Sequence, residues 1–326
     1  MSSNIKSHVI GIDVNVATTT ISVVNVRGDI LGTTTLSTGA YPNVSSFVEA
    51  ITQHAVELAE QTCGLAGVRS VGLSAPSANY LTGSIENAVN LPWKGNVPLS
   101  AMLRDRLGLA VAVGNDVHAT AMGEYVYGVA HGMENFIVIS LGHGGVGSCF
   151  FSHGHPHLGN RGFAGEVGHT CVVKDGRLCN CGRKGCLEEY ASDRGIIKTA
   201  QEVMAESDKP SLMRDLEELT PLTIGVCCDQ NDELALEVYR RTGYYLGIGL
   251  ANYASVINPE AIILTGEQTQ VYKWLGTPME QSFEEHVFGN IRNKVKLVVS
   301  TFDNHERDVL GASALAWTVK EYSLFL

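Results

Sequence analysis

The residues with the clearest chemical meaning lie between positions 166 and 189 of the 326-residue chain. His169, Cys179, Cys181 and Cys186 fall within eighteen residues, with glycines where the chain must turn. One imidazole and three thiolates are the donor set of a closed, tetrahedral structural zinc site, which keeps no open position for chemistry. Ordinary buried cysteines are the alternative. The Cys-x-Cys-Gly-x-x-Gly-Cys run favours the metal, and we expect Zn²⁺ bound by these four side chains.

Two glutamates flank the predicted zinc site, Glu166 before it and Glu188 after it. Glu166 and His169 are three residues apart, so they would share one face of a helical turn. If zinc takes one ring nitrogen of His169, the other nitrogen remains available as a donor. With Asn90 these side chains form a polar set suited to sugar hydroxyls, which need both donors and acceptors. A solvated surface position is the alternative for each of them.

Asp116 lies between a short apolar run at residues 111–113 and a helix-prone segment that begins at residue 119. A carboxylate at such a junction can reach a ligand hydroxyl. As a general base it would take a proton from an attacking alcohol, an effect worth about 10²–10⁴-fold. Asparagine and aspartate are also preferred helix N-caps. The two roles are compatible, and both stay open for Asp116.

Two further segments could contact a phosphate or its metal ion. Residues 142–147 form a glycine-rich turn whose backbone N–H groups could face a phosphate. His143 in this turn could donate to a phosphate, although a surface turn histidine is the simpler interpretation. Asp13 ends the first strand-like run and could hold Mg²⁺ through water, because magnesium keeps much of its hydration shell. An aspartate that starts a turn is the alternative.

The composition indicates a globular enzyme with a large core, 44% hydrophobic and 17% charged, and a length typical of two domains. A formal net charge of −11 without any basic run argues against a nucleic-acid partner. No run of about twenty apolar residues is present, so we expect no membrane span. The cysteines outside the zinc site are dispersed among apolar residues, which predicts a reduced, cytoplasmic location.

Both halves of the chain open with the same pattern, a strand, a turn and a returning strand. We expect strands at 8–14, 18–26 and 30–36 in the first half and at 136–141 and 148–152 in the second. The alternation of strands and helices predicts duplicated α/β domains that face each other across a cleft. Other expected elements are a helix through residues 47–58, strands at 68–73, 111–113 and 261–264, helices at 234–256 and 310–322, and short helices within 206–232.

With these residues in hand, the chain resembles the ROK family of bacterial sugar kinases and sugar-responsive repressors along nearly its whole length. The resemblance implies an α/β, two-domain actin-like and hexokinase-like (ribonuclease H-like) fold with a cleft between the domains. We place a smaller N-terminal domain at 1–117 plus 308–326 and a larger domain with the zinc site at 118–307. The segments that resemble family motifs are 72–93, 115–124, 141–147, 165–169, 179–188, 247–252 and 258–266.

The resemblance also implies an activity, the ATP-dependent phosphorylation of a hexose, glucose-like, at the 6-hydroxyl. It makes Asp116 the general base, ATP with Mg²⁺ the donor, zinc structural and the protein a homodimer or homotetramer; an N-acetylhexosamine or fructose is the alternative substrate. The implied sugar ligands are Asn90, Asn115, Asp116, Glu166, His169 and Glu188. The implied nucleotide-side residues are Asp13, Gly142, His143, Gly144 and Gly266.

Three departures from the family pattern all lie on the nucleotide side. The first phosphate loop, usually Asp-x-Gly-Gly-Thr, here continues from Asp13 as Val-Asn-Val-Ala. His143 stands where Thr or Ser is usual, and Thr265 and Glu267 interrupt a usual glycine triplet. A sugar-binding sensor with weak or lost kinase activity is therefore the second hypothesis. Family repressors carry an N-terminal helix-turn-helix, for which a first strand near His8 leaves no room.

Overall fold

The computed structural model describes residues 6–142 and 144–319, which divide into two compact units. The first unit comprises Met1–Gly132, Gly159–Phe163 and Thr301–Leu326, and the second comprises Met133–Leu158 and Ala164–Ser300. The first unit thus runs to Gly132 rather than to residue 117. The reason is that helix α3 (Asp116–Val126) packs along helix α9 (Asn304–Trp317) within that unit.

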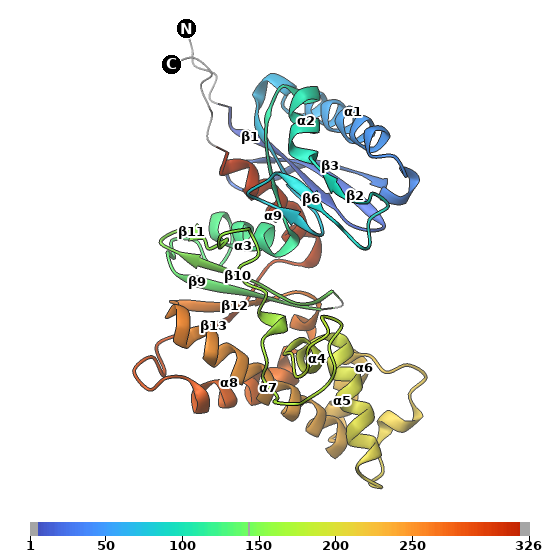
Figure 1. The fold of residues 1–326 in the computed structure, drawn as a ribbon, viewed down its shortest axis with the longest axis vertical. Helices are drawn as coiled ribbons and strands as arrows, with labels where there is room; N and C mark the ends of the chain where they lie inside the picture. The colour runs from blue at the N-terminus through green and yellow to red at the C-terminus, as the bar shows by residue number, and fades with distance from the viewer. Residues whose placement is uncertain (1–5, 143, 320–326) are drawn as a thin grey trace. The chain divides into compact units, whose positions relative to one another are not determined.

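The first unit is built on a five-stranded sheet of order β3-β2-β1-β4-β8 (Figure 1). Strands β1, β2 and β3 form the antiparallel meander that the sequence predicts, and β4 and β8 continue the sheet in parallel. The strands are β1 (His8–Val14), β2 (Thr18–Asn25), β3 (Ile30–Ser37), β4 (Val68–Ser74) and β8 (Ala110–Gly114). A small sheet beside them contains β5 (Ala78–Asn79), β6 (Ser84–Glu86) and β7 (Asn96–Val97).

Helices pack against this sheet through apolar faces. Helix α1 (Val44–Thr62) buries side chains at helical spacing, and Asn43 caps it by accepting from the Ser45 N–H. Together with α2 (Leu99–Leu107), it shares the main core of the unit with the strands. Helix α9 contacts β1, β4 and β8, and therefore joins the end of the chain to the first strands.

Gly72 in β4 marks the closest approach of α9 to the sheet. A Cβ atom there would overlap the carbonyl oxygen of Ala312 and lie 2.6 Å from the backbone nitrogen of Ala316. Backbone atoms of a packed helix cannot move aside singly, so any side chain at this position would push α9 outward.

We expect Gly72→Ala to lower the free energy of unfolding by about 3 kcal/mol, at the upper end of the cost of overpacking. Urea unfolding of the purified variant measures this. Gly39→Ala is the matched control, because a Cβ at Gly39 would have no neighbour within 4 Å. That control should change stability by less than about 1 kcal/mol. Equal stability of the two variants would contradict the close approach of α9.

The second unit repeats the arrangement with a sheet of order β11-β10-β9-β12-β13. As in the first unit, the chain of this unit begins with an antiparallel hairpin, here β9 and β10, and β12 and β13 run parallel to β9. Its strands are β9 (Phe136–Gly142), β10 (Gly145–Ser152), β11 (His155–Pro156), β12 (Ala261–Thr265) and β13 (Lys296–Val299). Its helices are α4 (Glu188–Ala191), α5 (Asp193–Ala205), α6 (Pro221–Asp229), α7 (Glu233–Ile257) and α8 (Tyr272–His286). The shared order confirms the predicted duplication.

The predicted start of the last helix needs correction. The last helix begins at Asn304, six residues before the predicted start, because Asp303 caps it by accepting from the Glu306 N–H at 2.8 Å. Residues 206–232 contain the short helices that we expected, a 3₁₀ turn (η4, Leu212–Asp215) and α6. The other 3₁₀ turns are η1 (Thr38–Ala40), η2 (Leu65–Gly67), η3 (Val167–His169) and η5 (Glu267–Val271).

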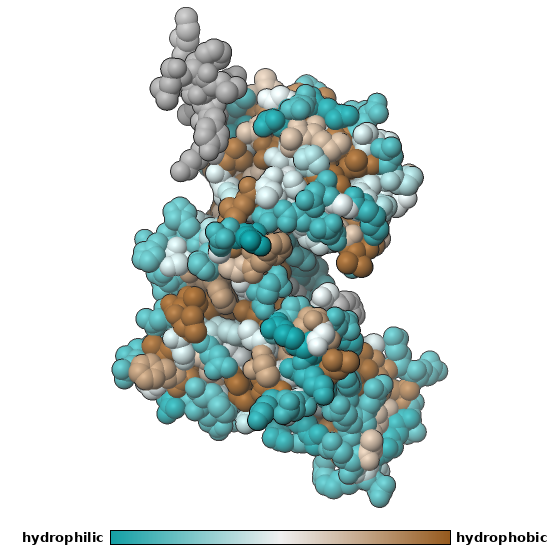
Figure 2. Space-filling model, in the orientation of Figure 1, coloured by the Kyte–Doolittle hydropathy of each residue, from teal (hydrophilic) through white to brown (hydrophobic). Residues whose placement is uncertain are grey.

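The length and composition of the described helices bear on whether any of them could span a membrane. Within residues 6–142 and 144–319, none of the helices combines the length and the apolar composition that a crossing would require. Figure 2 shows hydrophilic residues over most of the visible face, with hydrophobic residues in small groups.

Candidate functional site

The four predicted zinc ligands come together in the second unit. The ligand atoms of His169, Cys179, Cys181 and Cys186 all lie within 4.8 Å of one another. The Sγ atoms of Cys181 and Cys186 are 3.6 Å apart, and Nδ1 of His169 is 3.7 Å from Sγ of Cys179. These distances approach the edge, roughly 3.8 Å, of a tetrahedron with Zn–S bonds of about 2.3 Å. The donor set therefore fits one zinc ion.

Glycine turns fold the segment that carries the four ligands, residues 169–186, into a compact loop that we call the knuckle. Gly182 and Gly185 have positive φ angles of 84° and 76°, which place a turn on either side of Arg183. A Cβ at Gly185 would overlap the carbonyl oxygen of Val173. The backbone and side chain of Arg183 lower the pKa of Cys181 to about 6, which favours the thiolate that a metal requires.

His169 and Glu188 are held by the same knuckle. Since Nδ1 of His169 faces Cys179, its Nε2 is the nitrogen that stays available for a ligand. Glu188 starts α4, and its carboxylate lies within 4.8 Å of Sγ of Cys179. It accepts from the Val146 N–H at 3.3 Å and pairs with Arg194 at 3.2 Å. The side chain of Glu188 is thereby fixed against β10.

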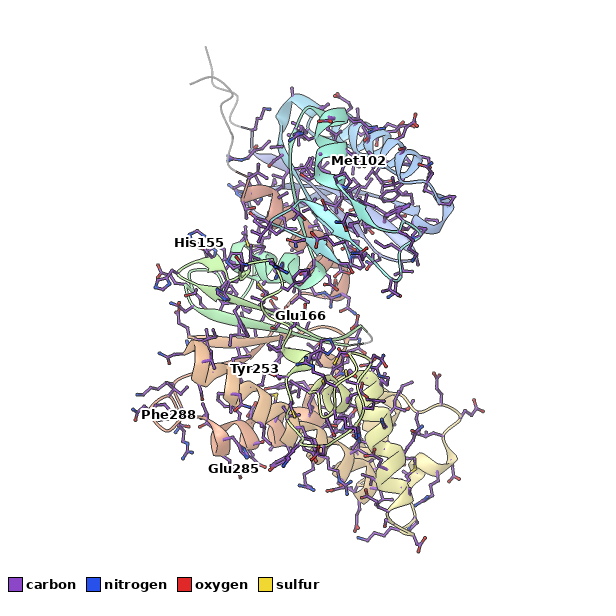
Figure 3. All side chains as sticks on the ribbon, viewed as in Figure 1. Met102, His155, Glu166, Tyr253, Glu285 and Phe288 are labelled. Carbon is purple, nitrogen blue, oxygen red and sulfur yellow. The ribbon has the colours of Figure 1, made fainter. Side chains whose placement is uncertain are left out.

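Two other predicted sugar residues, Glu166 and Asn90, are exposed. Glu166 immediately precedes the 3₁₀ turn η3, which carries His169, so the two lie on one short helical turn as expected. Figure 3 labels Glu166 near strand β10 of the second unit. In the first unit, Asn90 lies on an exposed bend between β6 and β7, close in sequence to the buried Trp93.

Asp116 is the first residue of helix α3, directly after strand β8. Asn115 is the N-cap, because its Oδ1 accepts from the His118 N–H at 2.7 Å; the cap alternative for Asp116 is wrong. The surrounding protein desolvates the Asp116 carboxyl and raises its pKa, although part of the residue stays open to solvent. The Val117 N–H donates to Oδ1 of Asp116 at 2.9 Å, and this hydrogen bond lowers the pKa in part.

Asp13 is the penultimate residue of β1 and is paired in register with Ser74 at the end of β4. Its side chain is buried and accepts from Nδ2 of Asn15 at 2.5 Å. Burial raises the pKa of Asp13 to about 7, and the negative charges of Asp308 and Asp116 add to this effect. The Ser74 hydroxyl lowers it in part.

Two charged residues of this group were missed in the sequence. Arg307 and Asp308 lie near the start of α9, where Nε of Arg307 donates to Asp308 at 2.9 Å. Their charges act on both Asp13 and Asp116. Nothing in their spacing marks them, since they come almost 200 residues after Asp116 in the chain. The approach of α9 to β1 brings them here.

We expect Asp13→Asn to stabilise the protein at pH 8 by about 1–3 kcal/mol, and much less at pH 4. The folded-state pKa is raised from 3.8 to about 7, so the wild-type loses stability as pH rises through this window. An amide carries no charge to desolvate and can still accept from Asn15. Urea unfolding at both pH values measures the difference. A variant equally destabilised at both would contradict the raised pKa.

The glycine turn of the second unit connects β9 and β10. Gly142 pairs with Gly145, and Gly144 is exposed between them. Gly266 follows β12 with a φ of 96°, and a Cβ there would overlap the carbonyl oxygen of Leu141. The structure thus brings Gly142 and Gly266 together, as the prediction of a nucleotide side requires. His143 lies outside the described residues.

A model of the family described as ROK matches residues 9–319. The chain belongs to the ROK family. A glucokinase of Halalkalibacterium halodurans is a ROK relative that is 35% identical over 256 residues, which cover 77% of this chain and 76% of that protein.

Two solved structures extend the ROK comparison. A ROK glucokinase from Streptomyces griseus, in complex with glucose and AMPPNP, is similar with a TM-score of 0.73 and 29% identity, covering 96% of this chain and 100% of that one. A ROK transcriptional regulator, a homologue of the E. coli MLC protein, gives a TM-score of 0.83 and 26% identity over 96% of this chain and 78% of that one. The chain therefore has the two-domain actin-like, hexokinase-like (ribonuclease H-like) fold of ROK proteins.

Proposed function

We propose that this chain transfers the terminal phosphoryl group of ATP to the 6-hydroxyl of a glucose-like hexose. The observation that carries the proposal is Asp116 at the start of α3, a residue that is partly exposed and whose carboxyl has a pKa raised by desolvation. A carboxylate whose pKa is raised is a stronger base than an ordinary aspartate and is suited to take up the hydroxyl proton. The similarity to glucokinases supports the same reaction.

In the proposed reaction, the sugar hydroxyl oxygen attacks the terminal phosphorus of ATP while Asp116 takes up the hydroxyl proton. The bond between that phosphorus and the bridging oxygen of ADP breaks, and ADP leaves with the electron pair. Phosphoryl transfer depends mainly on positioning and on the stabilisation of negative charge. The proposed hexose ligands are Asn90, Asn115 and Asp116 in the first unit and Glu166, His169 and Glu188 in the second.

Two metals have separate roles in the proposal. Magnesium, which would be held through water by Asp13, neutralises charge on the phosphates when it is bound with ATP. The carboxyl of Asp13 titrates near pH 7, so ionised Asp13 prevails only above neutrality. Zinc would be structural, because the three thiolates and one imidazole would fill all four positions of its tetrahedral coordination.

A sugar-binding sensor is the second candidate, and one observation favours it. Asn15 donates to Asp13 at 2.5 Å within the altered first loop, so one carboxylate oxygen is already engaged. The similarity to a ROK transcriptional regulator supports this alternative.

A coupled assay of ADP release tests the proposal. The sugars are glucose, mannose, fructose, N-acetylglucosamine, N-acetylmannosamine and allose, each with ATP and Mg²⁺. We expect turnover with glucose or a close relative. Absence of turnover with every sugar, together with calorimetric binding of a sugar but not of ATP, would favour the sensor.

A further inference from the structure

A carboxylate lies against the glycine turn that would face the nucleotide. A Cβ on Gly142 would overlap Oε2 of Glu267 and lie 2.9 Å from its Cδ. The carboxylate therefore occupies the space beside Gly142 that a side chain would fill at any other residue. Glu267 is half-buried there, at the start of the 3₁₀ turn η5.

The backbone on both sides of Glu267 is fixed. On one side, Gly266 packs on Leu141 with a positive φ, and its carbonyl accepts from the N–H and hydroxyl of Thr269 at 3.1 and 2.9 Å. On the other side, the buried Gln268 donates from Nε2 to Asp193 at 2.9 Å. The carboxylate of Glu267 thus starts from a backbone position that is set by packing and is not free to swing away with the chain.

No described residue of the unit neutralises the charge of Glu267 through an ion pair. Glu188, whose carboxylate lies against Gly145 on the other strand of the hairpin, is paired with Arg194 at 3.2 Å. Among the residues that the structure describes, no cation forms an ion pair with Glu267. Backbone N–H groups of a glycine turn attract anions. A carboxylate beside that turn, with no cation paired to it among the described residues, repels anions.

We propose that Glu267 is the specificity-determining residue for the phosphoryl donor, and that its carboxylate weakens the binding of nucleoside triphosphate at the Gly142 turn. The inference rests on the proposed function in that it takes this turn as the nucleotide side. A nucleotide must displace the carboxylate or approach it with its own charge neutralised by a divalent cation. Low nucleotide affinity is then a property of one side chain.

Glu267→Gln tests the proposal, because glutamine keeps the shape and removes the charge. We expect calorimetry to show ATP with Mg²⁺ binding about tenfold more tightly to this variant, a change of about 1.4 kcal/mol. The gain should shrink in 0.5 M salt, since screening weakens repulsion. The KM for ATP should fall in parallel, and the KM for the sugar should not change.

Glu285→Gln is the matched control, since Glu285 is an exposed glutamate of α8 in the same unit (Figure 3). It removes the same charge away from the turn and should leave nucleotide binding as it is. Glu267→Ala gives a second variant in case the glutamine disturbs folding, which thermal unfolding would reveal. Nucleotide affinity that is unchanged or weaker in both Glu267 variants would overturn the proposal.

The outcome separates this inference from the proposed function. If Glu267→Gln binds nucleotide more tightly but phosphorylates no sugar, the donor role of Glu267 stands and the kinase proposal fails. If the wild-type protein phosphorylates a hexose and Glu267→Gln leaves the KM for ATP unchanged, the kinase proposal stands and the role of Glu267 fails.

Discussion

Replacement of Asp116 by asparagine should lower the turnover of hexose phosphorylation by at least about 10²-fold and leave sugar binding largely intact. The amide keeps an oxygen that can accept from the Val117 N–H, as the carboxylate does at 2.9 Å, so α3 should keep its start. It cannot take up the proton of the attacking hydroxyl. The coupled assay measures turnover, and calorimetry with the preferred sugar measures binding.

Asp105→Asn is the control for Asp116→Asn, because Asp105 is an exposed aspartate of α2 in the same unit. It should behave as wild-type. Wild-type turnover in Asp116→Asn would remove Asp116 from the catalytic role.

In the wild-type enzyme, turnover should fall as the pH is lowered through about 7. Protonation of Asp13, with its pKa of about 7, and of Asp116, with its raised pKa, both act in that direction.

Removal of zinc should have the largest effect on stability. Metal analysis of the purified protein should give about one zinc per chain. Cys186→Ser, at a buried ligand position, should lose it, together with on the order of 4–5 kcal/mol of stability or more. The reason is that the knuckle folds around the metal, so the free energy of zinc binding contributes to the free energy of folding. Sugar affinity should fall as well, because the knuckle holds His169 and Glu188.

Cys171→Ser separates the ligands from a nearby thiol. Cys171 forms an isolated β-bridge with Cys186 but is exposed and is not one of the four grouped donors. The variant should keep its zinc and its melting temperature. Zinc loss in Cys171→Ser, or an unchanged melting temperature after chelation of the wild-type protein, would contradict the assignment of the donor set.

The sequence predicted those parts of the fold that depend on local pattern. The hairpins that open each unit, helix α7 and the zinc donors each lie within a short stretch of chain, where alternation, helical spacing and glycine turns are informative. Helices α2, α5 and α8, with strand β13 and the small sheet, were not predicted. The start of α9 was missed because its capping residue, Asp303, lies before any apolar periodicity.

The site was predictable only where its residues are close in sequence. His169, Glu188 and the cysteines come from one segment, and their proximity follows from the turn glycines. The contact of Glu267 with Gly142 joins residues more than 120 positions apart, and the neighbourhood of Asp308 and Asp13 joins nearly the two ends of the chain. Sheet order and helix packing create both, and no local pattern encodes them. The departures from the family pattern, Glu267 among them, indicated that the nucleotide side had changed. They did not predict which groups the new side chains contact.

The route of the chain through α9 also sets an order of events during synthesis. The first unit needs α9 over Gly72 and beside Asp116, and α9 is translated only after the second unit. Domains tend to fold as they leave the ribosome. The knuckle-bearing unit can therefore mature first, while the sheet that carries Asp13 waits with one face uncovered. A nascent chain stalled before residue 304 would hold a complete second unit and a first unit that still lacks α9.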